Sequence, residues 1–235
     1  MPMKKIFKMA TIYGVVTIAL LLCTKLGSRA VTTLSENKVP EREHCIVIDP
    51  GHGGEDGGAI SCSGFPESSY NLQISQKLND LLNLLGYQTK MIRTTDISVY
   101  TKGETLVQKK SSDLNERVNL INDTHGAILL SIHQNHFPDS RYSGAQVFYS
   151  KTDGSPQLAA QLQKAFVSTL NPGSHRQEKK SSGIYLMEHI QCPGVLIECG
   201  FLSNPEEDAK LRDPVYQNNL CSVISTTVCQ YLSNT

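Results

Sequence analysis

The sequence predicts a single α/β domain with a mainly parallel, twisted sheet flanked by helices. Short apolar runs alternate along the chain with longer segments of helical spacing, a pattern typical of parallel strands joined by helices. The chain has 235 residues, of which 39% are hydrophobic. That length is enough for one sizeable core and tight for two full domains. In such sheets ligands bind at the carboxyl edge of the strands, so we expect a functional site there.

Six short segments predict the strands. The first, CIVI, is a continuous apolar run of the kind that is buried on both faces of a parallel sheet. A glycine-dense loop, GHGGEDGGAI, follows it and would let the backbone crowd around a ligand. The predicted strands are 45–48, 88–93, 127–132, 145–150, 184–187 and 195–197.

Helix start and stop signals separate these strands. Leucines at helical spacing run to Gly86, and Glu67 stands at the start of that helix. Asp113 and Glu116 have the spacing of a capping box, which predicts a helix from 113 to about 123 after a long polar loop, 94–112. Ser155-Pro156 and Asp213-Pro214 predict the starts of two further helices, 155–170 and 214 to the end of the chain.

The first thirty residues differ from the rest of the chain. Lys4, Lys5 and Lys8 precede an uncharged run, 9–24. As a helix this run would measure ~24 Å, short of the ~30 Å hydrocarbon core. A basic flank before a short apolar run is typical of an export signal. We predict a signal peptide or membrane anchor at 1–30, cleavage after Ala30 staying open, then a polar linker at 31–43 and one folded domain at 44–235.

Charge and cysteine content narrow the function classes. The 22 basic residues balance 22 acidic ones, which gives no electrostatic footprint for nucleic acid. Outside the apolar run the chain has six cysteines, an even number that permits disulfides in an exported protein. However, no two have C-x-x-C spacing, and buried free thiols are the favoured interpretation. The six are Cys45, Cys62, Cys192, Cys199, Cys221 and Cys229.

Polar residues follow three of the predicted strands. They are expected to converge, because the carboxyl ends of parallel strands share one edge of the sheet. Two histidines and one carboxylate, with a second carboxylate as base, form the His₂Glu-plus-base set of hydrolytic zinc sites. The residues concerned are Asp49 and His52, then His133, Asn135 and His136, then Glu198, together with Glu67 at the helix start.

Six ordered blocks extend this hypothesis to a family. The chain contains VIDPGHGGEDGGAI, PESSYNLQIS, RTTD, ERVNLIN, LLSIHQNH and VLIECGFLSNPEE. These resemble, in order, the motifs of the zinc N-acetylmuramoyl-L-alanine amidases of the Amidase_3 type, over nearly the whole predicted domain. The resemblance implies Zn²⁺ held by His52, Glu67 and His133, with Glu198 as the catalytic carboxylate. It also implies hydrolysis of the amide between N-acetylmuramic acid and L-alanine in peptidoglycan stem peptides.

For the residues near the predicted zinc ligands, a functional role and a purely structural role are both considered. Asp49 is either a partner that orients His52 or a strand-end residue that bonds the turn. Asn135 is expected to order its loop rather than touch substrate. Arg117 matches an arginine of the family, and an ion pair that anchors its helix is the favoured role. The spare histidines His136 and His189 are expected to be bystanders, and alternation along the strand predicts that Cys199 points away from the site.

Within the family, the block GIYLMEHIQCPGVLIECGFLSN and the N-terminal signal look most like the spore-cortex amidases of the CwlD type. That resemblance implies action on exported peptidoglycan, in the forespore cortex, towards muramic-δ-lactam and germination. A need for an accessory protein stays open. The alternatives are a cell-separating autolysin, a non-catalytic peptidoglycan-binding module on an amidase fold, and a zinc peptidase that cuts within the stem peptide.

Overall fold

The computed structural model describes residues 44–234. The predicted signal or anchor (1–30) and linker (31–43) lie outside the described residues. Among those described, no helix combines the length and apolar character that a membrane crossing requires.

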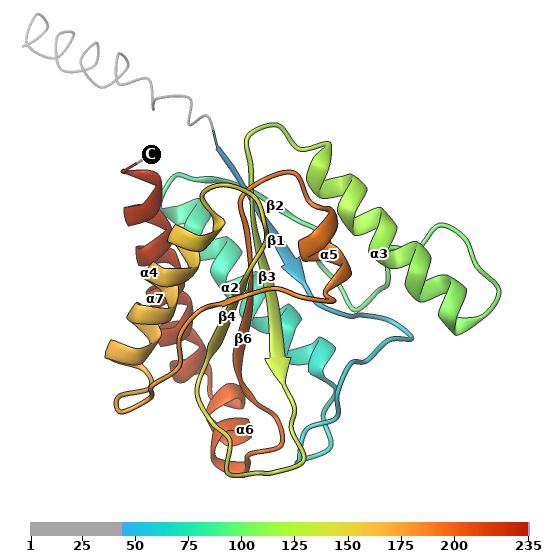
Figure 1. The fold of residues 1–235 in the computed structure, drawn as a ribbon. Helices are drawn as coiled ribbons and strands as arrows, with labels where there is room; N and C mark the ends of the chain where they lie inside the picture. Colours follow the sequence, from blue (N-terminus) through green and yellow to red (C-terminus); the bar gives the residue numbers. More distant parts are fainter. Residues whose placement is uncertain (1–43, 235) are drawn as a thin grey trace, which may run out of the picture. The chain divides into compact units, whose positions relative to one another are not determined.

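Six strands form one sheet with the spatial order β2-β1-β3-β6-β4-β5. All neighbouring pairs are parallel except β4 with β6, which are antiparallel. The predicted mainly parallel α/β domain is therefore confirmed (Figure 1). The strands are β1 (Cys45–Pro50), β2 (Gln88–Met91), β3 (Ala127–Asn135), β4 (Gln146–Tyr149), β5 (Lys179–Lys180) and β6 (Gly194–Phe201).

Helices cover both faces of the sheet. Three long helices, α2, α4 and α7, pack together on one face, and α3 packs with the short α5 on the other (Figure 1). The bounds are α2 (Glu67–Leu84), α3 (Leu106–Asn122), α4 (Ser155–Thr169), α5 (Tyr185–His189), α6 (Pro205–Arg212) and α7 (Pro214–Leu232).

The apolar side chains divide between two clusters, one under each helical layer. Along β1 the division alternates: Ile46 and Ile48 join the larger cluster with α2, α4 and α7, whereas Val47 joins the smaller one with α3 and α5. All three are fully buried, as expected for a strand in the middle of a covered parallel sheet. Because apolar side chains fill both faces of the sheet, the polar side chains gather at the carboxyl ends of β1, β3 and β6.

One predicted element and the start of another are wrong. Residues 184–187 do not form a strand, because Ile184 is the N-cap of helix α5 and the others lie in it; five helical residues are too few to show a distinct period. Helix α3 begins at Leu106 rather than Asp113. Its capping box is Thr105 with Gln108, and each side chain bonds the other residue's backbone N–H. Asp113 lies inside the helix and bonds Arg117 instead.

Other boundaries shift by less. Strand β3 runs three residues past the predicted end, and β6 also extends further at its carboxyl end. The two-residue β5 and the eight-residue α6 were not predicted as elements. The helix at 155 begins as expected, although Gly154 rather than Ser155 is its cap. Asp213 caps α7 through a bond from the Val215 N–H, as predicted. The six described cysteines are free thiols.

Candidate metal centre

Four of the predicted site residues come together at the carboxyl edge of the sheet. His52 lies in the loop after β1, Glu67 is the first residue of α2, and His133 lies on β3. His52 Nε2 is 3.2 Å from Glu67 Oε2, and His133 Nδ1 is 2.9 Å from Glu67 Oε1. Glu198 stands beside His133, since these two residues pair directly between β6 and β3.

The loop that carries His52 has an unusual backbone conformation and close internal contacts. His52 adopts a φ of 59°, a left-handed conformation that only a few per cent of non-glycine residues show. A Cβ at Gly51 would overlap the His133 ring, and one at Gly58 would lie 2.6 Å from Glu67 Oε2. The two glycines therefore let the loop close onto the ligands.

The second ring nitrogen of His52 has a partner that the sequence did not single out. His52 Nδ1 lies 3.0 Å from Asp56 Oδ2, while its Nε2 faces Glu67. Lys110 Nζ lies 3.2 Å from the same Asp56 oxygen. A carboxylate on the outer nitrogen fixes the tautomer and orientation of a metal-binding histidine. The only sequence signal for Asp56 is its place in the GHGGED loop, four residues after His52.

Glu67 is held as an anion. Its Oε2 accepts a bond from the Ala59 N–H, and its Oε1 accepts bonds from the Gln134 N–H and the Asn71 amide. Burial alone would raise the pKa of Glu67, but hydrogen bonds with the two histidines hold it well below its ordinary value. The carboxylate is thus fixed in its ionised form between two nitrogen donors.

Glu198 differs from Glu67 in this respect. Its Oε2 is buried and has no hydrogen-bond partner among the described residues. Burial raises the pKa of Glu198 to about 7; the charge of Glu67 adds to the rise, and His133 and His52 act against it. A carboxyl group with a pKa near neutrality can both accept and return a proton at that pH.

Asp49 does not touch the ring of His52. It forms a buried ion pair with Arg117, Asp49 Oδ1 to Nη1 at 2.5 Å, and its Oδ2 accepts from the Ser131 hydroxyl. Arg117 also pairs with Asp113 and donates to the carbonyls of Pro50 and His52. The structure therefore places Arg117 in ion pairs that tie α3 to the end of β1, and Asp49 acts on the loop through it.

A second buried arginine, Arg93 of the RTTD block, organises the same turn. It donates to four backbone carbonyls, those of Pro50, Gly51, Ser68 and Thr95. The segment just before Glu67 and the first turn of α2 are both tied to α6, where Asp208 accepts bonds from the Ser63 N–H and the Tyr70 hydroxyl. Neither anchor was predicted, because a buried polar side chain bonded to distant backbone has no sequence period.

The remaining candidates lie outside the cluster. Asn135 contributes its backbone carbonyl, which accepts from the Leu202 N–H and orders the strand end. His136 is exposed, and His189 stacks on Tyr185 within α5. Cys199 is buried in the larger apolar cluster, so it points away from Glu198 as alternation predicted.

The donor set fits a zinc ion. The three ligand atoms offered by His52, Glu67 and His133 lie within 4.8 Å of one another. Two imidazoles and one carboxylate, with a fourth position open to water, are typical of catalytic zinc sites. Glu198, whose Oε2 has no hydrogen-bond partner among the described residues, interacts electrostatically with His133, Glu67 and His52. These residues can together bind the metal and transfer a proton beside it.

Comparison with known proteins gives a consistent result. Residues 46–230 match the family described as N-acetylmuramoyl-L-alanine amidase. The chain is 36% identical over 190 residues to the germination-specific N-acetylmuramoyl-L-alanine amidase of Bacillus subtilis, covering 80% of this chain and 79% of that protein. It is 30% identical over 207 residues to LytC of the same organism, covering 86% of this chain but only 38% of LytC.

A solved structure agrees with the sequence relatives. The CwlD amidase from Clostridioides difficile, determined in complex with the GerS lipoprotein, superimposes with a TM-score of 0.78 at 35% identity. The superposition covers 82% of this chain and 100% of that one. Likeness at this level extends to the arrangement of the whole described domain.

Proposed function

The chain belongs to the N-acetylmuramoyl-L-alanine amidase family, and we propose that it hydrolyses its amide bond with a zinc ion held by His52, Glu67 and His133. The bond is the one between N-acetylmuramic acid and the L-alanine of a peptidoglycan stem peptide. Zinc bound there would make a water molecule acidic enough to deprotonate near neutral pH and would polarise the amide carbonyl. The catalytic domain is proposed to span residues 44–235.

In this proposal Glu198 moves the protons. Its free oxygen accepts the proton of the attacking water and then donates it to the nitrogen of the departing alanine. A pKa of about 7 suits both steps, because the group gains and loses a proton with little cost. Asp56 keeps His52 oriented, and Arg117 holds the loop backbone in place. The observation that carries the proposal is the direct pairing of Glu198 with His133.

Fragment analysis tests the reaction. Residues 44–235, loaded with zinc, are incubated with purified peptidoglycan, and the released fragments are identified by mass spectrometry. We expect intact stem peptides with a free L-alanine amino group and sugars without peptide. Fragments cut within the peptide would identify a zinc peptidase instead. Binding to peptidoglycan without any new amino group would identify a non-catalytic module.

We further propose a role in the spore cortex. The support is the 36% identity to a germination-specific amidase and the likeness to the CwlD amidase. The product, muramic acid without its peptide, is the substrate that a deacetylating and cyclising step would need to form muramic-δ-lactam. Spores that lack this chain should therefore lack muramic-δ-lactam, and normal lactam content in such spores would contradict the role.

Export and an accessory protein complete the proposal. Lys4, Lys5 and Lys8 before the apolar run 9–24 support delivery across a membrane by a signal peptide or anchor. Because the CwlD amidase of Clostridioides difficile was determined in complex with the GerS lipoprotein, we propose that this amidase also takes a protein partner. Full function of a chain that begins at Val31, with no replacement signal, would contradict the export proposal.

A further inference from the structure

Asn71 is a fully buried asparagine whose side chain joins the three segments that carry the proposed metal ligands. It lies one turn after Glu67 in α2, and its Nδ2 donates to Glu67 Oε1 at 3.2 Å. The same nitrogen donates to the carbonyl of Gly51, the residue before His52, at 3.1 Å. Its Oδ1 accepts from Gln134 Nε2 at 3.2 Å, beside the proposed ligand on β3. Each partner of Asn71 is therefore a proposed ligand or the neighbour of one.

The chemistry of these partners fixes the orientation of the Asn71 amide. The Gly51 carbonyl can only accept a hydrogen bond, and so can the ionised carboxylate of Glu67. The atom of Asn71 that faces both of them must therefore be the nitrogen. The oxygen then faces Gln134, whose backbone N–H also donates to Glu67 Oε1, at 3.1 Å. Strand β3 thus holds the amide with its two donors directed at the loop and at α2.

Glu67 has few side-chain partners. Within residues 44–234, Asn71 is the only side chain other than the two histidines that bonds its carboxylate. The remaining bonds to Glu67 come from the backbone N–H groups of Ala59 and Gln134. Of the side chains that are not themselves proposed ligands, Asn71 alone can therefore fix the position of Glu67 directly.

We propose that Asn71 is a positioning residue of the metal centre, which holds Glu67 and the loop of His52 in place before the metal binds. This rests on the proposed zinc amidase function. A side chain that orients a metal ligand typically raises metal affinity about 10- to 100-fold. In the loaded enzyme the bonds to the metal also hold the ligands, so Asn71 acts on zinc affinity and not on proton transfer by Glu198.

Asn71→Leu tests the proposal, because leucine has a similar size and forms no side-chain hydrogen bond. We expect the Kd for zinc, measured by competition with a chromophoric chelator, to rise by about 10- to 100-fold. The kcat on peptidoglycan should return to the wild-type value when zinc is saturating. An increase in Kd with full recovery of kcat separates a positioning role from a role in the reaction itself.

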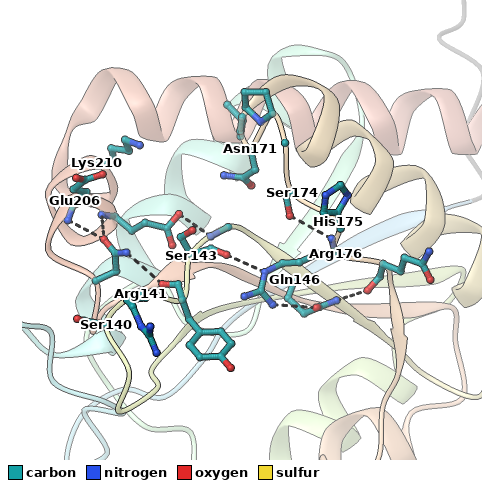
Figure 2. A pocket seen from close by; sticks show the side chains of 18 of the residues that line it. Ser140, Arg141, Ser143, Gln146, Asn171, Ser174, His175, Arg176, Glu206 and Lys210 are labelled. Carbon is teal, nitrogen blue, oxygen red and sulfur yellow. Dashed lines mark hydrogen bonds between the residues drawn. The ribbon is translucent and has the colours of Figure 1, made fainter.

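Asn171→Leu is the matched control. Asn171 lines an open groove of about 1380 Å³, in which Figure 2 shows its side chain. It accepts a hydrogen bond from the Ala145 N–H at 3.0 Å, and none of the described residues that line this groove is a proposed ligand. The same substitution at this site should leave the Kd for zinc unchanged.

Hydrogen exchange in the metal-free protein gives a second measurement. The N–H groups of Ala59 and Gln134 both donate to the carboxylate of Glu67, so their exchange rates report on its position. In Asn71→Leu both amides should exchange about tenfold faster or more, as measured by NMR. The amides of β6 should keep their wild-type rates, which shows that the variant is folded.

The two measurements can each overturn the proposal. An unchanged Kd for zinc in Asn71→Leu, or an equal increase in Asn171→Leu, would remove the positioning role. Faster exchange throughout the domain would show that Asn71 stabilises the fold in general. If the wild type binds no zinc, the proposed function fails, and the exchange rates of Ala59 and Gln134 still decide whether Asn71 positions Glu67. Unchanged rates at both amides would show that it does not.

Discussion

His133 and His52 face the same carboxylate from two very different supports. His133 lies on β3, an inner strand bonded on both sides, to β1 and β6. His52 lies in a loop, with a left-handed backbone conformation. The first histidine is placed by the sheet, and the second depends on polar side chains: Asp56 at its ring and Arg117 at its carbonyl. A rigid ladder needs no dedicated partner to aim a side chain, whereas a loop does.

The largest loss of zinc binding and activity is expected for a substitution of His133, on strand β3. His133→Ala should abolish both zinc binding and hydrolysis, because it removes one of the three proposed protein ligands. The thermal unfolding of the metal-free protein should change little, since the ladder bonds of β3 use the backbone. Metal content by elemental analysis and peptide release measure the two properties. A variant that keeps one zinc per chain and normal turnover would show that His133 is not a ligand.

Glu198→Gln tests the proposed base, which lies on strand β6. Glutamine keeps the shape of the side chain but cannot accept a proton, so kcat should fall by roughly 10²–10⁴. Zinc should stay bound, because His52, Glu67 and His133 are untouched. Single-turnover rates and metal content separate the two properties. Loss of zinc to the extent seen with His133→Ala would make Glu198 a ligand instead of a base.

A substitution beside His52, in the loop, should have a smaller effect than the two strand substitutions. Asp56→Asn leaves all three proposed ligands in place but weakens the support of the His52 ring, so the Kd for zinc should rise by about 10- to 100-fold. Competition with a chromophoric chelator measures that Kd. Asp139→Asn is the control, because the Asp139 side chain bonds only Arg141 among the residues that the structure describes. An unchanged Kd for Asp56→Asn would mean that the backbone alone orients His52.

The smallest effect is a shift in pH dependence. Burial would lower the pKa of His52, but its bonds to Glu67 and Asp56 raise it above the ordinary value. Zinc needs the neutral ring, so protons compete and zinc affinity should fall from about pH 8 to about pH 6. In Asp56→Asn the pKa of His52 should drop, and the fall in affinity should move to lower pH. Identical profiles for the two proteins would contradict a role of Asp56 in this titration.

For the metal-free protein the sign of the pH effect is opposite. A raised pKa means that protonated His52 stabilises the folded state below its ordinary, unfolded-state pKa. This contribution is lost as the pH rises through the raised value. Thermal unfolding without zinc should therefore become easier at higher pH, to the extent that His52 contributes.

The same contrast explains what the sequence could predict. Continuous apolar runs predicted β1, β3 and β6, and the groups at their ends fell where the strand register places them. The predicted strand at 184–187 is wrong, because the five residues of α5 (185–189) show no distinguishable period. The start of α3 was missed because its capping box, Thr105 and Gln108, opens a polar first turn rather than an apolar run.

At the site, side chains whose partners depend on the folding of a loop escaped prediction. His52, Glu67, His133 and Glu198 were all predicted and lie together. Asp56 was not, and Asp49 turned out to bond Arg117 and Ser131 rather than the ring of His52. Such contacts depend on how a loop folds back in space. Neither spacing nor composition records them, whereas a strand end has a fixed place in the sheet.

The two outer strands also bear on how the protein behaves at high concentration. A protein with a formal net charge of zero lacks the mutual repulsion that keeps molecules apart in solution. Unpaired strand edges would then invite a second chain to extend the sheet. Here one edge, β2, has four residues, and the other, β5, consists of the exposed Lys179 and Lys180 alone. Short edges, one of them purely cationic, offer a neighbouring molecule almost no ladder to join, so edge-to-edge aggregation is blocked at the sheet itself.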